Sequence, residues 1–230
     1  MARTTQRGRA AKTTRTTPML RNFYILLGLM VVVGIAVVGT ATLRRDAPAA
    51  AGTASYAGSD LPAKGSASAP VTVVEYADFQ CPGCGAFATQ MEAQFTRDYI
   101  DTGKVRMLYH DFPLQQHPNA IPAAEAARCA AQQNAFWPMH DMLFARQDAW
   151  STQSQPLAAF LGYADALKLD RAAFQSCMEQ HSTQPAVLAA RQASMNASIM
   201  QTPTFVINGR QYDATQLRSA VDAALGAQGK

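Results

Sequence analysis

The order of β-prone and helical segments predicts an α/β fold in which a block of helices interrupts a β-α-β … β-β-α arrangement. A β-prone apolar run, residues 71–79, leads into a Cys-Pro-Gly-Cys turn and then into helical spacing. Residues 118–196 show helical spacing alone, and an Asn208-Gly209 pair separates two short β-prone runs. Together these features predict an α/β sandwich with a helical insertion at about residues 116–198.

The expected elements follow one another along residues 70–228. Apolar side chains recur every four residues after the cysteines, which predicts a helix that ends at Gly103, a suitable C′ residue. Within the insertion, Asp170 is the expected N-cap of one helix. The other expected elements are strands over about 71–76 and 104–110, the helix over about 84–101, a hairpin over 203–212 and a last amphipathic helix over about 215–225.

Positive charge is concentrated at the N-terminus. Residues 1–45 contain eight of the 20 Lys and Arg residues and no acid. The rest of the chain holds twelve basic and all sixteen acidic side chains, which gives it a net charge of −4. The basic balance therefore belongs to the tail, and nucleic-acid binding is not expected. Residues 1–21 are expected to be a disordered basic cytoplasmic tail.

Residues 22–43 predict one transmembrane helix before the folded domain. These residues carry no charge, and as a helix they span roughly 33 Å, enough to cross a bilayer core. The segment is longer than the apolar region of a cleaved signal peptide, and Arg44-Arg45 stands where a small-residue cleavage site is usual. We therefore expect an uncleaved signal anchor rather than a cleaved signal.

The positive-inside rule orients this single-pass anchor. The basic residues before it place the N-terminus in the cytoplasm and the remaining chain in an extracytoplasmic, periplasmic space. Residues 44–69 are rich in Ala, Gly, Ser and Pro and are expected to be a flexible linker. An oxidising compartment permits stable disulfides, so the four cysteines are expected as two pairs.

Cys81 and Cys84 carry the predicted chemistry. A strand, a turn and a helix would place Cys81 at a helix N-terminus, where unpaired N–H groups and the helix dipole favour a thiolate. Cys84, covered behind it, would supply the second thiol for disulfide exchange. Half of a zinc site is the alternative, but zinc needs a second Cys or His pair at ligand spacing. The chain has no such pair, so we expect a redox pair and no metal.

Four stretches carry a family signature. They are residues 75–84 (EYADFQCPGC), 109–114 (YHDFPL), 127–144 (with ARCA and FWPMHDMLF) and 202–209 (TPTFVING). In this order they resemble the DsbA-like thiol–disulfide oxidoreductases over about residues 70–228. The resemblance implies a thioredoxin-like fold with a helical insertion, and a reaction that needs no cofactor.

The resemblance implies that Cys81 is the nucleophile and Cys84 the resolving thiol. Pro82 and Gly83 would tune the potential of the pair and meet the substrate. Many relatives have a histidine where Gly83 stands, and its absence removes one stabiliser of the thiolate. We therefore expect the pKa of Cys81 to be moderately lowered and the disulfide to be less oxidising than in the extreme members.

Three further residues gain roles from the resemblance. By strand alternation Glu75 faces inward, where a buried carboxyl with a raised pKa would relay protons to the resolving thiol; a solvated edge glutamate is the alternative. Pro203 is expected to follow a cis bond and to pack against the disulfide, and the Thr202 backbone to pair with an extended substrate. Asp78 is expected to be an exposed loop acid.

Cys129 and Cys177 are expected to form a structural disulfide across the insertion. The alternative, a relay of electrons to Cys81, lacks support because neither residue lies in a C-x-x-C motif. The four histidines are scattered and receive no catalytic role; His140, in an apolar helical run, is expected in the core.

These features predict a membrane-anchored thiol–disulfide oxidoreductase that passes the Cys81–Cys84 disulfide to cysteines of exported proteins. By resemblance, a membrane oxidase of the DsbB or VKOR type would reoxidise it. A reductase or isomerase of the same fold is an alternative, although no dimerisation segment is evident and a monomer is expected. The rival from another class is a non-enzymatic chaperone or binding module.

Overall fold

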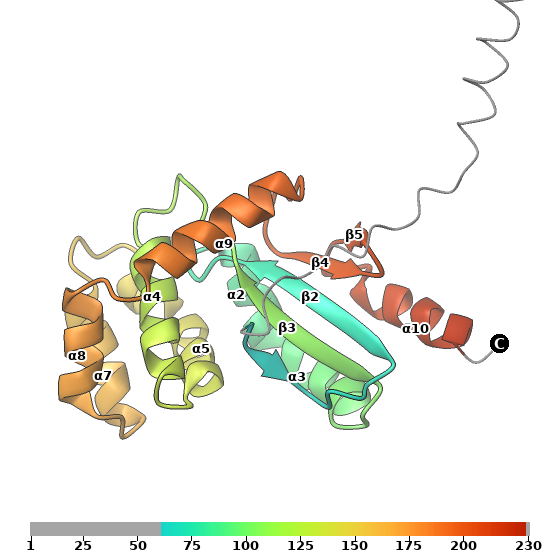
Figure 1. Ribbon diagram of the computed structural model, residues 1–230, viewed down its shortest axis with the longest axis horizontal. Coiled ribbons are helices and arrows are strands. Elements are labelled where there is room, and N and C mark those ends of the chain that lie inside the picture. Colours follow the sequence, from blue (N-terminus) through green and yellow to red (C-terminus); the bar gives the residue numbers. More distant parts are fainter. Residues whose placement is uncertain (1–60, 229–230) are drawn as a thin grey trace, which may run out of the picture. The chain divides into compact units, whose positions relative to one another are not determined.

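The active site lies on the face of the central sheet that packs against the helix after Cys81. The computed structural model describes residues 61–228, which form a mixed sheet with helices packed against it (Figure 1). In spatial order the strands are β1 (Ala63–Lys64), β3 (Val105–Asp111), β2 (Val71–Ala77), β4 (Thr204–Ile207) and β5 (Arg210–Tyr212).

β2 and β3 are parallel, and every other neighbouring pair is antiparallel. Both central strands begin and end within one residue of their predicted positions. In β2, Val73 and Glu75 face the active-site helix, whereas Val74 and Tyr76 face the opposite side. Because both faces are covered, six of the seven residues of β2 are buried.

β1 lies in the stretch that composition assigns to the flexible linker. Ala63 and Lys64 pair with β3, and the Tyr109 N–H donates to the Pro62 carbonyl at 3.0 Å. The Trp137 indole N–H also donates to the Ala63 carbonyl at 2.9 Å. The ordered domain therefore starts before Pro70, because these residues find backbone partners that the local sequence does not reveal.

The active-site helix starts two residues earlier than predicted and contains two π-helical turns. Its consecutive pieces are α2 (Pro82–Ala86), η1 (Phe87–Met91), α3 (Glu92–Phe95) and η2 (Thr96–Ile100). Gly103 ends it as predicted: its φ of +71° is left-handed, its N–H donates to the Ile100 carbonyl, and the Lys104 N–H donates to the Tyr99 carbonyl. This is the Schellman arrangement that glycine favours.

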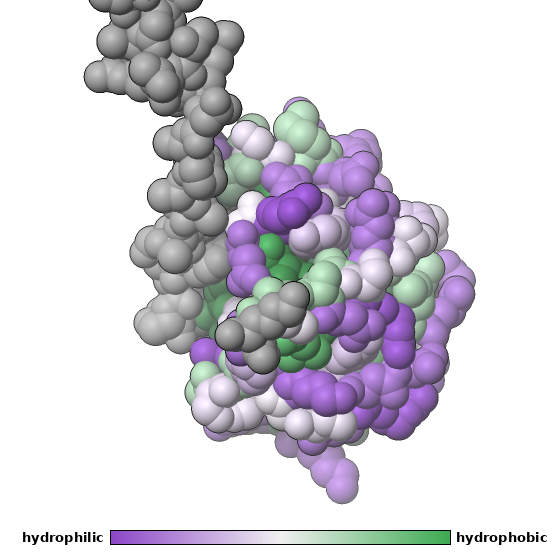
Figure 2. Space-filling view, turned by 90° about the vertical axis from the view of Figure 1, so that its right-hand side faces the viewer, coloured by the Kyte–Doolittle hydropathy of each residue, from purple (hydrophilic) through white to green (hydrophobic). Residues whose placement is uncertain are grey.

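The C-terminal hairpin joins β4 and β5 through Asn208 and Gly209. Both residues have positive φ, +50° and +76°, as a two-residue type I′ turn requires. The last helix, α10 (Leu217–Gln228), buries Leu217 and Val221 against the sheet. Figure 2 shows this side of the molecule, where hydrophilic residues prevail and hydrophobic ones occupy smaller areas.

Helices from Ala120 to Asn196 form the insertion (Figure 1). Asp170 caps one of them, since its carboxylate accepts from the Ala173 N–H at 3.0 Å. The insertion shares an apolar core with the active-site loop and β3, which includes Phe79, Tyr109, Met139, Leu143 and Trp150. The helices are α4 (Ala120–Ala131), α5 (Phe136–Ala145), α6 (Gln147–Trp150), α7 (Leu157–Ala166), α8 (Arg171–Glu179) and α9 (Gln184–Asn196).

The predicted tail and anchor lie outside the described residues. Within residues 61–228, no helix has both the length and the apolar character needed to cross a bilayer. The transmembrane helix expected at residues 22–43 therefore stays a prediction.

A disulfide joins Cys129 of α4 to Cys177 of α8, with 5.9 Å between their Cα atoms. Both residues belong to the apolar core that the insertion shares with the active-site loop. The bond closes a loop with a sequence separation of 48 residues. Closing such a loop removes conformational freedom from the unfolded chain.

Replacing Cys129 and Cys177 together by alanine should therefore lower the free energy of unfolding, by about 4 kcal/mol in the loop-entropy account. Denaturant unfolding of the full chain measures this change. Disulfide exchange at Cys81 should survive. A folded double variant that has lost exchange would instead identify the bond as an electron relay.

Candidate active site

Cys81 and Cys84 stand at the start of the active-site helix. Cys81 is the N-cap residue of α2, and Cys84 lies in its first turn. Both are free thiols in this structure. Cys81 keeps 8% of its surface exposed and Cys84 none, so Cys81 is the thiol that a substrate can reach.

The environment shifts the two thiols in opposite directions. A hydrogen bond with the Cys84 side chain lowers the pKa of Cys81 to about 5, against the opposing effect of burial; the Thr202 side chain and the N–H groups of Cys84 and Gly83 contribute further lowering. Burial raises the pKa of Cys84 well above its ordinary value, and the neighbouring Cys81 and Glu75 add to this. The pair thus consists of one stabilised thiolate and one protonated thiol.

The lowered pKa of Cys81, about 5, agrees in direction with the lowering expected from its place at a helix N-terminus. The expected contribution of the helix N-terminus is present, but the partner thiol contributes more. Sequence reasoning named the helix N-terminus alone, because the distance between the sulfur atoms depends on side-chain conformations that the sequence does not reveal.

The loop before β4 packs on the cysteine pair. The Thr202–Pro203 bond is cis, and Sγ of Cys81 lies 3.4 Å from the Thr202 carbonyl oxygen, which accepts a hydrogen bond when the sulfur is protonated. A Cβ atom on Gly83 would lie 3.2 Å from Cδ of Pro203, tighter than an ordinary contact. Gly83 therefore permits the close approach of this loop. Pro82, at the first helical position, is exposed beside Cys81.

Glu75 lies beneath the pair, on β2, and is 1% exposed. Its neighbours across the sheet are Tyr109 and Phe205. Burial raises its pKa well above the ordinary value; the charge of Glu92 raises it further and that of Lys64 lowers it. Among the described residues, its Oε2 atom has no hydrogen-bond partner. The structure thus places Glu75 inward and close to Cys84, and not at a solvated edge.

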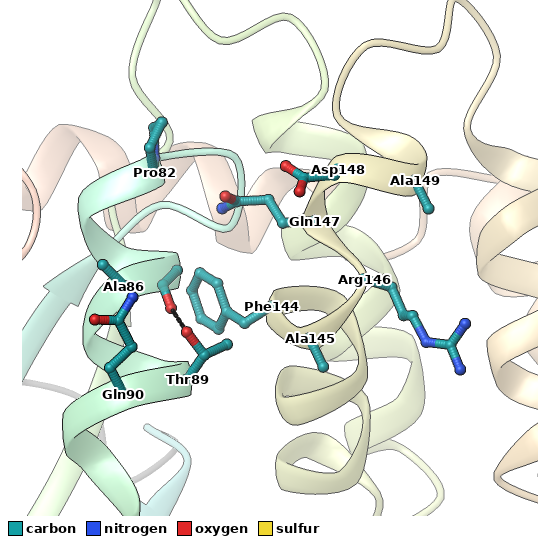
Figure 3. A pocket seen from close by; sticks show the side chains of 11 residues that line it. Pro82, Ala86, Thr89, Gln90, Phe144, Ala145, Arg146, Gln147, Asp148 and Ala149 are labelled. Carbon is teal, nitrogen blue, oxygen red and sulfur yellow. Dashed lines mark hydrogen bonds between the residues drawn. The ribbon is translucent and has the colours of Figure 1, made fainter.

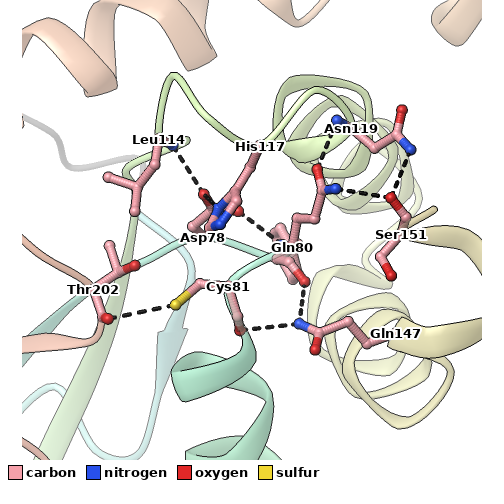
Figure 4. A network of polar contacts seen from close by, with 10 residues as sticks. Asp78, Gln80, Cys81, Leu114, His117, Asn119, Gln147, Ser151 and Thr202 are labelled. Carbon is pink, nitrogen blue, oxygen red and sulfur yellow. Dashed lines mark hydrogen bonds and ion pairs between the residues drawn. The ribbon is translucent and has the colours of Figure 1, made fainter.

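Asp78 is not the exposed loop acid that its position in the sequence suggested, because it is 1% exposed. Its carboxylate accepts from the Gln80 N–H at 2.7 Å and the Leu114 N–H at 2.8 Å, and lies 2.7 Å from Nδ1 of His117 (Figure 4). The Cys81 N–H donates to the Asp78 carbonyl. Asp78 therefore joins the active-site loop to the loop after β3.

Gln147 of the insertion fixes the same loop from the other side. Its Nε2 donates to the carbonyls of Phe79 at 2.7 Å and Cys81 at 3.0 Å (Figure 4). Gly85 leaves room for it, since a Cβ there would lie 2.8 Å from its Oε1. Sequence reasoning missed Gln147, because nothing local marks a glutamine 66 residues away as a partner of Cys81.

A groove runs beside Pro82 between the active-site helix and the insertion. It has a volume of about 420 Å³ and is lined by Thr89 and Gln90 on one side and by Phe144, Arg146 and Asp148 on the other (Figure 3). A cleft with polar and charged side chains therefore begins at Pro82, the residue after Cys81.

A second cluster of ionisable groups lies along the active-site helix. Ligand-type atoms of Glu92, His140 and Asp141 lie within 4.8 Å of one another. The Lys64 ammonium is 2.7 Å from Glu92 Oε1 and 4.3 Å from the centre of the Trp137 ring. Because a protein cation already supplies positive charge here, we assign no metal to this cluster. His140 is fully buried against aromatic rings, as expected from its apolar run.

Comparison with known proteins places this geometry in a family. A family model described as thioredoxin matches residues 60–227. The chain belongs to the thioredoxin family. The match begins before β1, in keeping with the early start of the folded domain.

Two curated proteins that resemble this chain carry the names of an antiporter and of a protein-disulfide oxidoreductase. The chain is 40% identical over 163 residues to a Na⁺/H⁺ antiporter NhaA of Salinispora tropica, covering 70% of this chain and 24% of that protein. It thus spans about a quarter of the length of that relative. It is 27% identical over 164 residues to a candidate protein-disulfide oxidoreductase of Rickettsia felis, covering 69% of this chain and 58% of that one.

Several solved structures share this fold. BdbD of Bacillus subtilis, in its oxidised form, matches with a TM-score of 0.66 at 22% identity, covering 72% of this chain and 93% of that one. The α-DsbA1 protein of Wolbachia pipientis matches with a TM-score of 0.65 at 21% identity, covering 74% and 92%. At these identities the likeness establishes the fold.

Cys81 should titrate near pH 5 in the reduced full chain, and Cys84 should stay protonated through neutral pH. Ultraviolet absorbance of the thiolate against pH measures both, with Cys84→Ser to assign the signal. A Cys81 that titrates at the free-cysteine value of about 8.5, or a more acidic Cys84, would contradict the assigned roles.

The same shift links pH to the stability of the reduced protein. A lowered pKa stabilises the folded state fully above the pKa of an unfolded cysteine, about 8.5. This contribution is lost as the pH falls through about 5. As the pH falls from about 8.5 to about 5, the melting temperature of the reduced form should therefore decrease relative to that of the oxidised form.

Proposed function

We propose that this protein is a thiol–disulfide oxidoreductase that transfers the Cys81–Cys84 disulfide to cysteines of exported proteins. The observation that supports this best is the opposed pair of thiols: an accessible Cys81 with a pKa of about 5 and a covered Cys84 whose pKa is raised. A stabilised thiolate makes Cys81 a good leaving group and its disulfide a good oxidant.

The proposed reaction has two exchange steps. A substrate thiolate attacks Sγ of Cys81 in the disulfide, which forms a mixed disulfide and releases Cys84 as a thiolate. Glu75, buried beside it with a raised pKa, gives that sulfur a proton. A second substrate thiolate then attacks the substrate sulfur of the mixed disulfide and releases the Cys81 thiolate. Two electrons have passed from the substrate to the cysteine pair.

The loop beside the pair would hold the substrate. Thr202 lies at the edge of the site with its carbonyl at Cys81, so its backbone can pair with an extended substrate segment. Pro82 and Gly83 would contact the residues next to the substrate cysteine, and Pro203 would pack against the mixed disulfide. These roles use only groups that lie around the accessible sulfur.

The proposed setting is the outer side of a cell membrane. Residues 22–43 would anchor a monomer with its N-terminus in the cytoplasm, and residues 44–60 would tether the domain. Reduced exported proteins would be the substrates. A membrane oxidase of the DsbB or VKOR type would accept the two electrons and restore the Cys81–Cys84 disulfide.

The oxidised full chain should convert a reduced dithiol peptide to its disulfide. Cys84→Ser with a reduced Cys81, given the disulfide form of the peptide, should instead accumulate a mixed disulfide, because the Cys81 thiolate attacks the peptide disulfide and releases one peptide thiolate. Without Cys84 the pair cannot reform its own disulfide, so a mixed disulfide made by disulfide exchange persists. Non-reducing electrophoresis and mass spectrometry detect this species, with Cys81→Ser as the matched control that should trap nothing.

The same assay separates the alternatives. Net reduction of a disulfide substrate, or reshuffling of a scrambled one, would identify a reductase or an isomerase. Suppression of aggregation by Cys81→Ser/Cys84→Ser as effectively as by the wild type, without any exchange, would identify a binding module.

The proposed anchor predicts that the mature protein keeps residues 22–43 and fractionates with membranes. An apolar span of this length is stable in a bilayer core, and detergent should be needed to release it. N-terminal sequencing of the isolated protein is the measurement. A mature N-terminus beyond Leu43 would show that the segment is a cleaved signal.

A further inference from the structure

Glu75 needs a path to solvent if it is to give a proton in every turnover. Its own side chain is 1% exposed, and the accessible side of the site is occupied by Cys81, which a bound substrate would cover. The ionisable groups around it come from several elements: Cys84 of α2, Glu92 of α3, Lys64 of β1 and Tyr109 of β3, with His140 and Asp141 of α5 beside Lys64 and Glu92.

Three of these charged groups, Asp141, Lys64 and Glu92, lie between the protein surface and the buried region of Glu75. Side-chain exposure falls from 64% for Asp141 to 24% for Lys64 and 5% for Glu92, and then to the buried Glu75. Lys64 and Glu92 are joined at 2.7 Å. Both interact electrostatically with Glu75. The charged groups thus become less exposed from Asp141 to Glu92, and the charges of Lys64 and Glu92 act on the buried carboxyl.

A cleft reaches all three of these charged groups. Its volume is about 290 Å³, and it is lined by Lys64, Ala88, Glu92, Ala93, Thr96 and Asp141. Neither Cys81 nor the Thr202 loop contributes to its lining. A peptide bound across Cys81 would therefore leave this cleft open to water.

We propose that this cleft is the route by which Glu75 exchanges protons with solvent, and that the Lys64–Glu92 ion pair sets the pH at which Glu75 protonates Cys84. After Glu75 has given its proton to the Cys84 thiolate, solvent in the cleft restores a proton to Glu75. One proton moves from solvent to Cys84 for each disulfide opened, and the reverse occurs on reoxidation. Lys64 and Glu92 are positioning residues, and the inference deepens the proposed function.

The two charges of the pair act on Glu75 with opposite sign, which gives a sharp test. Lys64→Met removes a positive charge and should move the titration midpoint of Glu75 up, whereas Glu92→Gln removes a negative charge and should move it down, each by about 0.5 pH unit or more. The readout is the ¹³C NMR signal of the Glu75 carboxyl in the reduced full chain, assigned with Glu75→Gln. Lys64→Arg should leave the midpoint in place.

A matched pair on the same helical segment serves as control. Asp98 and Arg218 form an ion pair between η2 and α10, and neither contributes to the environment of Glu75. Asp98→Asn and Arg218→Met make the same charge changes and should not move the midpoint. Loss of packing alone would shift Lys64→Met and Glu92→Gln in the same direction, and this result, or no shift in either, would overturn the assignment.

Kinetics test the route itself. The rate at which Cys84 resolves a preformed Cys81 mixed disulfide should follow the shifted midpoints of Lys64→Met and Glu92→Gln. Ala88→Leu, which narrows the cleft without changing charge, should slow resolution severalfold at an unchanged midpoint; an unchanged rate would overturn the route. If the wild type exchanges no disulfide at all, the proposed function is wrong, and the NMR titrations still decide whether Lys64 and Glu92 control Glu75.

Discussion

The site depends on the contact between the first turn of the active-site helix and the loop before β4. Residues 121 positions apart meet there, with Sγ of Cys81 at 3.4 Å from the Thr202 carbonyl. The antiparallel register of β2 with β4, in which Glu75 lies opposite Phe205, brings that loop to this point. Gly83 then allows the loop to close on the helix. The sheet therefore determines which backbone group faces the reactive sulfur.

The loop that carries Cys81 is held from two sides by side chains remote in sequence. Asp78 ties it to the segment after β3, and Gln147 ties it to the insertion (Figure 4). Each hydrogen bond pairs a buried polar group that would otherwise lose its contact with water. The insertion therefore contributes to the rigidity of the loop and so to the environment of the cysteine pair.

The sequence predicted correctly those features that depend only on residues close together in the chain. Alternation in β2 placed Glu75 inward, Gly103 ended the helix in a left-handed conformation, and Asn208-Gly209 formed the tight turn. Sequence reasoning failed where distant segments decide. Asp78 is buried because Leu114 and His117 supply its partners, and Lys64 looked like linker because β3 and Glu92 are far away in the chain.

Because the folded domain starts before Pro70, the point at which the chain is shortened affects the active site. Composition suggests cutting the chain at Pro70, which would keep both cysteines, the whole helix after them and the disulfide of the insertion. Such a fragment would nevertheless lack β1, the backbone bond from Tyr109 to Pro62 and the only lysine that pairs with Glu92 among residues 61–228. Glu92, whose side chain is 5% exposed in the intact domain, would then lose its counter-charge, so a shortened domain that folds would misreport the acid–base behaviour of the intact protein.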